Sequence, residues 1–580
     1  MTIENFALIM IGFGAIIGVI TLIYVLKRAF SRQAGELGGW EMAGARQIIT
    51  AVAKTAVAEG LRTRIASGFV MLVVASVPFF YLTAEGDGTI KGKVQMFMTY
   101  SLGFSGFLLA LLSILFACRS LSNEISGRQI FGIVSKPVPR WQILIGKFAG
   151  VMILNMLLLT YVGVTTYIGT LALVGGFKSN LHDELITYGS FTPAQAAAAV
   201  ESLENVRGMG KEGMESPIIA AISNATGLPQ QKIGETLLRL PEATRADLRR
   251  FDELRRQVLI ARATIKPEIP EKQIRAEVEK RLAKMQEDGT LPSHMTERQV
   301  REELDKQMFG YFATIAPFDS QGWILKGPPP PKGEELIMSV RYKMHVPQVI
   351  PAINHPQTGA KLEEDMVLCI WAIGNPQSAH YYESVEPVPA RTVQEMEFPV
   401  DAVEADGTIR IEFGNIDPRR VDVVFDVVKD ALQVLYVVGS FELNLFMACI
   451  AMLVPLASLT AFGVCASTFL SFPVGALLVI CLYLISSSMD FVKEAMAVTE
   501  DYMPDTVTTD ILVRKTVVDS IGWLLSIGDI QVTERLLDGR VVGWTDLWAD
   551  VWRYLLLKSG ATLMIGVLVF RRRELAAIIV

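Results

Sequence analysis

The chain has 580 residues, of which 51% are apolar and only 20% are charged, and its mean hydropathy is +0.37. Soluble chains carry about 25% charged residues, so the composition indicates long stretches that belong in lipid. The net charge of −6 argues against a nucleic-acid partner, because proteins that bind phosphate backbones usually present a basic face.

The apolar residues are concentrated in seven stretches that could each cross a bilayer, which takes about 20 mostly apolar residues. In chain order they are 6–26, 65–84, 96–118, 148–174, 438–462, 469–492 and 554–570. Only a short, uncharged link at 466–471 joins the fifth stretch to the sixth. A polar region, about 178–436, separates the fourth from the fifth.

The first apolar stretch is followed, rather than preceded, by Lys27, Arg28 and Arg32, so it is expected to be an uncleaved anchor and not a signal peptide. Further basic residues collect in 46–64, 119–147 and 571–573, and the positive-inside rule assigns such clusters to the cytoplasm. Seven spans with the N-terminus outside satisfy this rule. They place the C-terminus in the cytoplasm and residues 178–436 outside a plasma (inner) membrane.

The first half of the polar region is expected to be helical. Runs at 243–262 and 270–308 mix Glu, Arg and Lys with apolar residues at three- and four-residue spacing. Such helices form either an ordinary solvated surface or an arm that binds a partner, and the sequence leaves both readings open.

The second half is expected to be rich in strands. Gly327 followed by four prolines ends the helical part. Short runs with strand character follow at 335–345, 366–373, 392–400, 408–413 and 421–427. Strands of this length and spacing are typical of a β-sandwich or jelly roll, which could bind a sugar or a protein.

The stretch 493–552 is too polar to span a membrane. Its four tryptophans suit an interfacial segment on the outer face, and they are Trp523, Trp544, Trp548 and Trp552. A loop without function and a gate are both compatible with this pattern.

The loop after the third span carries the most informative pattern. Ser122 or Asn123 could cap a short helix there, with Glu124 near its positive end. Lys136-Pro137 would end that helix, and Arg140 and Lys147 would flank the next span at the lipid headgroups. This arrangement is either a handle for a cytoplasmic protein or a plain charged loop.

The order of Glu124, Gly127, Ser135-Lys136-Pro137, Arg140-Trp141 and Gly146-Lys147 resembles the signature of ABC type-2 transporter permeases. Residues 47–64 are similar to the interfacial helix of that family, and 570–575 to its terminus. The resemblance covers 47–176 and 437–580. The first span and the insertion after the fourth lie outside the minimal family pattern.

The resemblance implies a six-helix core formed by the second to seventh spans, in a homodimer or paired with a similar permease. It also implies that the loop 119–142 docks on a separate ABC ATP-binding subunit. The docking residues it suggests are Glu124, Gly127, Arg128, Lys136, Pro137 and Arg140.

The predicted fold is therefore an α-helical polytopic membrane protein with a large inserted extracytoplasmic α+β domain that ends in a β-sandwich-like part. Its expected divisions are 1–46 (anchor and linker), 47–176 (first half of the permease core), 177–320 (external helices), 321–436 (external strands) and 437–580 (second half of the core).

No catalytic, metal or cofactor site is expected. The chain lacks a Gly-x-x-x-x-Gly-Lys-[Ser/Thr] phosphate loop, so ATP hydrolysis is assigned to a partner. Of the five cysteines only Cys369 lies in the polar region, which excludes a disulfide framework there, and the five histidines are scattered singly.

The expected function is a permease subunit that moves an unknown substrate across the lipid bilayer. The alternative is a non-transporting scaffold or mechanotransmission protein whose external domain binds an envelope partner. A membrane-bound enzyme acting through the external domain is a third, weaker candidate, because no nucleophile motif is present.

Overall fold

The computed structural model describes residues 45–127, 139–189, 191–203, 215–267, 271–288, 300, 301, 304, 308, 313–328, 337–346, 350–354, 361–376, 378, 380–425, 431–502, 522, 526 and 532–572. The chain divides into two compact units. The helical unit comprises Met1–Val200, Thr236–Ala261 and Gly439–Val580, and the β unit comprises Glu201–Glu235 and Arg262–Val438. The stretch 236–261 therefore belongs with the helical unit, although the sequence places it among the external helices.

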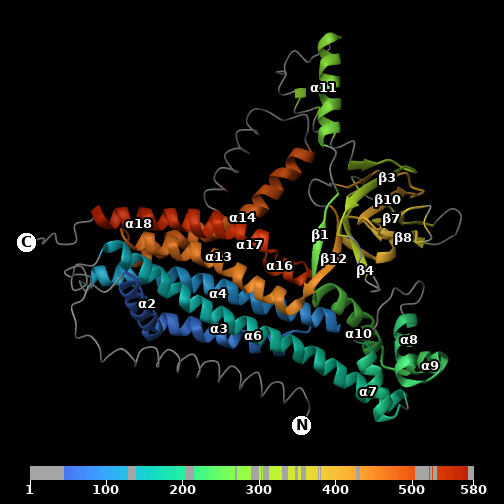
Figure 1. Ribbon diagram of the computed structural model, residues 1–580, viewed down its shortest axis with the longest axis horizontal. Helices are drawn as coiled ribbons and strands as arrows, with labels where there is room; N and C mark the ends of the chain where they lie inside the picture. The colour runs from blue at the N-terminus through green and yellow to red at the C-terminus, as the bar shows by residue number, and fades with distance from the viewer. Residues whose placement is uncertain are drawn as a thin grey trace, which may run out of the picture. The chain divides into compact units, whose positions relative to one another are not determined.

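The helical unit contains the long helices that are side by side in Figure 1. Its helices are α2 (Ala45–Arg62), α3 (Arg64–Thr83), α4 (Ile90–Ser126), α6 (Arg140–Gly189), α7 (Pro193–Ser202), α10 (Glu242–Glu253), the π-helical η2 (Leu254–Val258), α13 (Phe441–Ser467), α14 (Phe472–Tyr502), α16 (Val532–Leu537), α17 (Trp544–Asp550), the π-helical η6 (Val551–Ser559) and α18 (Gly560–Arg572). Six helical stretches among the described residues are long and apolar enough to cross a membrane. They coincide with the second to seventh predicted spans, whereas the first, 6–26, lies outside the described residues.

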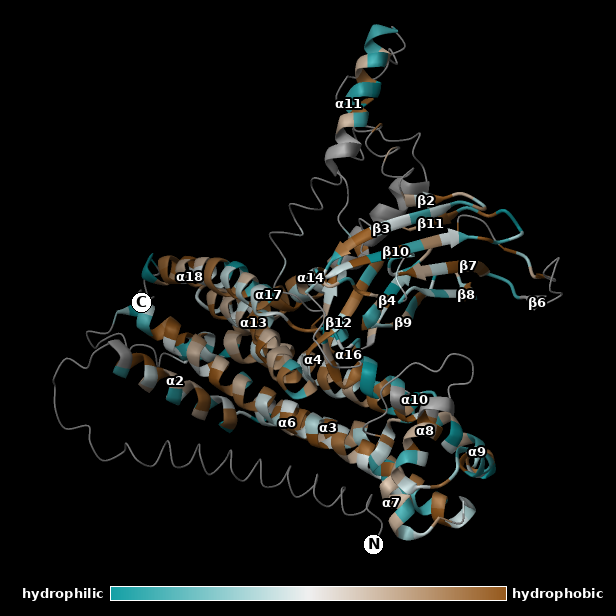
Figure 2. Ribbon diagram, turned by 45° about the vertical axis from the view of Figure 1, so that its right-hand side comes forward, coloured by the Kyte–Doolittle hydropathy of each residue, from teal (hydrophilic) through white to brown (hydrophobic). Residues whose placement is uncertain are grey.

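Helices α4, α6 and α13 pack against one another at the centre of this unit. Figure 2 shows hydrophobic residues along much of α3, α6 and α13. Large apolar side chains are exposed on the surrounding helices, for example Met71 on α3, Leu477 on α14 and Met564 on α18, each more than 60% exposed. Such a surface is costly in water and favourable in lipid, which identifies the helical unit as a membrane part.

The tryptophans expected at an interface lie on one helical face. Trp544, Trp548 and Trp552 follow at four-residue spacing along α17 and η6, and each is more than half exposed. Trp523 lies outside the described residues. The exposed row continues into Leu556 and Met564, so aromatic side chains precede an apolar face along one helical segment.

Proline breaks the hydrogen-bond ladder of α3, and a neighbouring helix compensates. Pro78 lies inside α3 and has no N–H, so the carbonyl of Val74 lacks its usual helical donor. The hydroxyl of Tyr161 on α6 donates to this carbonyl at 3.0 Å. A polar group freed inside an apolar bundle is thus satisfied across a helix–helix contact.

Replacing Tyr161 by Phe should lower the free energy of unfolding by about 1 kcal/mol, because the Val74 carbonyl then has no donor. Thermal unfolding of the detergent-purified chain measures this loss. Tyr188→Phe, at an exposed site on the same helix, is the matched control and should change little. Equal effects of the two substitutions would refute this role for Tyr161.

The β unit is built on two four-stranded sheets, in the orders β1-β12-β4-β9 and β3-β10-β7-β8. Its strands are β1 (Ile260–Ile265), β2 (Thr314–Ile315), β3 (Ser320–Lys326), β4 (Ile337–Lys343), β5 (Ile353–Asn354), β6 (Lys361–Leu362), β7 (Met366–Ile373), β8 (Tyr382–Pro389), β9 (Val393–Pro399), β10 (Thr408–Asn415), β11 (Val423–Val424) and β12 (Leu432–Ser440). Helices α8 (Glu215–Thr226), α9 (Gln230–Arg239) and α11 (Glu271–Glu287) precede most of them. Side chains from both sheets share one hydrophobic core, which is the arrangement of a β-sandwich.

Aromatic rings fill the centre of that core. Trp371 on β7 has its ring centroid 4.6 Å from that of Tyr342 on β4 and 5.0 Å from that of Phe413 on β10. Strand β7 alternates buried and half-buried residues along its whole length, as expected for a strand with one face against a core. This alternation explains why the sequence predicts both ends of β7.

Four strands of the two four-stranded sheets were not predicted, and one helical prediction was wrong in part. The run 243–262 is helical only to Val258, because β-branched Ile260 and Ile265 bound a strand that pairs in the first sheet. Strand β8 contains two prolines, which argue against a strand, but it lies at a sheet edge where proline is tolerated. The others are β3, the opposite edge of that sheet, and β12, whose end overlaps the predicted fifth span.

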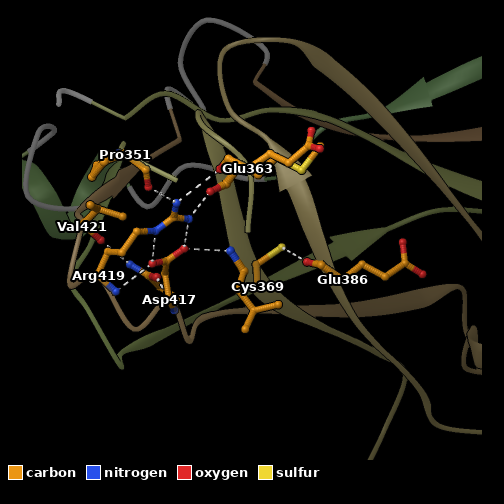
Figure 3. Close-up of polar contacts among 10 residues, drawn as sticks. Pro351, Glu363, Cys369, Glu386, Asp417, Arg419 and Val421 are labelled. Atoms are coloured by element: carbon orange, nitrogen blue, oxygen red, sulfur yellow. Dashed lines mark hydrogen bonds and ion pairs between the residues drawn. The ribbon is translucent and has the colours of Figure 1, made fainter. Parts of the chain in front are cut away.

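A buried ion pair holds the loop after β10 (Figure 3). Asp417 is fully buried, and Arg419 donates to its two carboxylate oxygens at 2.6 and 2.8 Å. Arg419 also donates to the carbonyls of Pro351, at 3.0 Å, and of Met366. Burial alone raises the pKa of Asp417, but the hydrogen bonds from Arg419 and from the Leu368 N–H outweigh it and hold that pKa below 3.8.

Arg419→Gln should destabilise the β unit by roughly 3–5 kcal/mol at neutral pH, because it leaves a buried carboxylate without its cation. In the natural chain a lowered pKa means stability that is present above pH 3.8 and lost as pH falls through the folded value. The variant loses this contribution, so its deficit should shrink below about pH 4.

Hydrogen exchange of residues 361–425 in the intact chain, measured at pH 7 and at pH 3.5, tests this expectation. Arg410→Gln is the control, since Arg410 pairs with Glu404 at 2.8 Å on an exposed surface and should cost at most about 1 kcal/mol. A deficit for Arg419→Gln that does not depend on pH would contradict the assigned pKa.

Candidate functional site

The predicted docking loop joins α4 to α6, and the structure describes only its two flanks. Arg128, Lys136 and Pro137 lie outside the described residues. Glu124 and Gly127 end α4, and Arg140 begins α6. The loop therefore connects two of the helices at the centre of the helical unit.

The prediction of a short helix capped by Ser122 or Asn123 is wrong. Helix α4 continues through both residues to Ser126, and the N–H of Gly127 donates to the carbonyl of Asn123 at 2.8 Å. No glycine or proline occurs between Phe107 and Ser126, so nothing interrupts the helix. Glu124 consequently lies near the negative end of a long helix and needs another source of stabilisation.

Lys147 supplies that stabilisation from α6. Its ammonium nitrogen lies 2.5 Å from Oε1 of Glu124 and 3.4 Å from Oε2 of Glu59 on α2. The Lys147 side chain is only 2% exposed and that of Glu124 11%, whereas Glu59 is 37% exposed. One buried cation thus ties together three helices.

Close packing brings α2 to this position. A β-carbon added to Gly146 would lie 2.6 Å from Cβ of Val52, and one added to Gly150 would lie 2.8 Å from Cβ of Ala56. The two glycines, four residues apart on α6, let the backbones of α2 and α6 approach closely. Lys147 follows the first glycine directly, so the same approach that needs glycine also brings Glu59 to its ammonium group.

Arg140 ties a fourth helix to the same region. Its guanidinium donates to the carbonyls of Phe570 and Arg571 at 2.5 and 3.0 Å, and lies 5.5 Å from the centroid of the Phe570 ring. These carbonyls belong to the last turn of α18, where a cation satisfies groups that have no helical donor. The basic end of α18 therefore lies beside the first residue of α6.

The hairpin between α13 and α14 also contacts the end of α4. The hydroxyl of Ser122 lies 3.5 Å from the carbonyl of Leu470, and the guanidinium of Arg119 lies 5.8 Å from the centroid of the Phe472 ring. The short link expected at 466–471 is confirmed by the bounds of the two helices. We call the region defined by Glu59, Arg119, Glu124, Arg140 and Lys147 the ionic end of the helical unit.

The geometry changes the role that Glu124 can have. Its carboxylate is paired with the buried Lys147, so Glu124 holds helices together, and its docking role stays a prediction. Sequence reasoning missed Glu59, and its placement of Lys147 at the lipid headgroups is wrong, because the Lys147 side chain is buried between the two carboxylates. The available signal was the pair of glycines at 146 and 150, which marks close packing on α6 but does not name the helix that approaches.

Within the described ranges no group of three or more His, Cys, Asp or Glu side chains could hold a metal ion. Cys369 in the β unit is buried, which raises the pKa of its thiol to about 12 and keeps it protonated. Comparison with protein-family models, with curated proteins and with solved structures finds no match to this chain.

Lys147→Met should destabilise the helical unit by roughly 3–5 kcal/mol, because it leaves two carboxylates facing each other without a cation. Adding Glu124→Leu to Lys147→Met should recover much of this loss, since a well-packed apolar pair can replace a buried ion pair. Thermal unfolding in detergent measures both effects. Lys280→Met, at a 79% exposed surface pair, is the control, and a similar loss there would contradict this account.

Proposed function

We propose that this chain is the membrane-spanning permease subunit of an ATP-driven ABC transporter. It would work as a homodimer or beside a similar permease, and ATP would be hydrolysed on a separate ATP-binding subunit. The observation that carries the proposal is the ionic end, where the flanks of the candidate docking loop are joined to α2, α14 and α18.

The contacts of the ionic end suit a region on which a bound ATPase would exert force. A push on the loop between α4 and α6 acts on both helices at once. Lys147 then passes it to α2 through Glu59, and Arg140 passes it to the end of α18. A transporter has to change the packing of its membrane-spanning helices. A force applied at one point can move several of them together if they are joined at that point.

The proposed orientation rests on the same contacts. Arg140 touches the end of α18, so the described basic residues after the third predicted span lie at the same end of the bundle as Arg571 and Arg572. The positive-inside rule assigns that end to the cytoplasm. We therefore propose seven spans in a plasma (inner) membrane, an N-terminus outside, and the insertion 178–436 on the outer side.

A scaffold or mechanotransmission role for the insertion is the second candidate. Strand β12 ends at Ser440 and α13 begins at Phe441, so the chain passes from the β-sandwich into a span without a linker. An envelope partner or a substrate bound to the sandwich could act on α13 through this connection. In that case the chain would need no bound ATPase.

Arg128→Glu should reduce copurification of an ATPase from native membranes at least tenfold, because charge reversal places repulsion in the proposed contact. Arg128 is a cleaner test than Glu124, whose charge stabilises the bundle itself. Arg281→Glu, on α11 of the insertion, is the matched control. Both variants should insert normally into the membrane. If neither loses the ATPase, the docking assignment is wrong, and if the natural chain brings none down, the scaffold role is favoured.

A further inference from the structure

One segment of the polar insertion is bound to the end of α4 that lies opposite the ionic end. Asp247 on α10 accepts a hydrogen bond from the backbone N–H of Ile90, the first residue of α4, at 2.6 Å. The two residues are 157 positions apart in the chain. A carboxylate at this place satisfies a donor that has no helical acceptor and neutralises the positive helix end.

An ion pair reinforces this contact. The ammonium group of Lys91 lies 2.8 Å from Oε2 of Glu253 and 2.7 Å from Oε1 of Gln257. Arg250 also donates to Oε2 of Glu253, at 2.7 Å. The Lys91 and Glu253 side chains are 18% and 21% exposed, so solvent screens this pair less than a surface pair.

Apolar packing holds the same segment. Phe251 on α10 is buried, and its ring centroid lies 5.0 Å from that of Phe177 on α6. Leu254 and Val258 on η2 are also buried. A β-carbon on Gly539 would lie 2.0 Å from the carbonyl oxygen of Gln257, so the loop after α16 also packs against η2.

Helix α4 joins this contact to the ionic end without a break. It runs for 37 residues with no proline, which corresponds to about 55 Å. Ile90 and Lys91 at one end bind α10 and η2, and Glu124 at the other binds Lys147. A displacement of one end therefore reaches the other through a single rigid element.

We propose that α10 and η2 form a latch on α4, with Asp247 and Lys91 as positioning residues that couple the insertion to the ionic end. The regulatory meaning of this latch rests on the proposed function, because movement at the ionic end would be driven by the ATPase. In the latched state α10 and η2 are held against α4, and movement of α4 along its axis strains the bonds to Asp247 and Glu253. The latch segment leads directly into β1, so its movement also moves the first strand of the sandwich.

A double-mutant cycle tests the coupling in the full-length chain in lipid nanodiscs, without any partner. Asp247→Asn should raise hydrogen exchange in residues 242–258 about tenfold, because it removes a charged acceptor. Glu124→Gln, at the far end of α4, should raise exchange in the same residues at least twofold. The two effects should be non-additive, whereas independent sites this far apart add.

Lys91→Met breaks the ion pair with Glu253 but keeps the hydrogen bond to Asp247. It therefore replaces Asp247→Asn in the cycle if Asp247→Asn unfolds residues 242–258. Arg62→Gln, an exposed residue at the end of α2, is the control and should leave exchange in 242–258 unchanged. Additive effects, or no effect of Glu124→Gln on 242–258, would overturn the proposal. Failure of the natural chain to bring down an ATPase in a pull-down would instead count against the proposed function and leave the result of the cycle intact.

Discussion

The buried charge of Lys147 is the constraint on which the helical unit depends. A cation removed from water costs several kcal/mol unless oxygen atoms of opposite charge surround it, and the protein provides two carboxylates from two other helices. The carboxylate of Glu59 reaches Lys147 only if α2 lies directly on α6, and the glycines at positions 146 and 150 allow this close approach. Charge and close packing therefore require each other, and neither would hold the three helices in this arrangement alone.

The two ends of α4 carry partial charges of opposite sign, and each end is stabilised by a side chain from a distant part of the chain. The N–H groups at Ile90 carry partial positive charge and are met by the carboxylate of Asp247. The carbonyls of the last turns carry partial negative charge, and Glu124 adds to it, so a buried cation is needed there. Both solutions come from distant parts of the chain, which makes the position of α4 sensitive to what happens in each of them.

The sequence predicts well what local pattern determines. Six of the seven predicted apolar stretches coincide with described long helices, and the seventh, 6–26, lies outside the described residues. Strand β7 was predicted at both ends because buried residues alternate along it. Prediction failed where tertiary context decides. Strand β8 carries prolines that only an edge tolerates, and the end of α4 was mistaken for a new helix because Ser122 and Asn123 resemble a cap. Glu59 and Lys147 lie 88 residues apart, and no local rule pairs them.

Contacts between distant residues also decide to which of the two units α10 and η2 belong. By polarity, α10 and η2 belong to the insertion, since Arg250 and Glu253 are typical of a solvated helix. Yet Asp247 satisfies the end of a span and Phe251 packs on α6, so the segment is part of the bundle. An insertion attached only by its termini could be replaced without effect on the spans. This insertion instead supplies the cap of a central helix, and any change in it must be compatible with the position of α4.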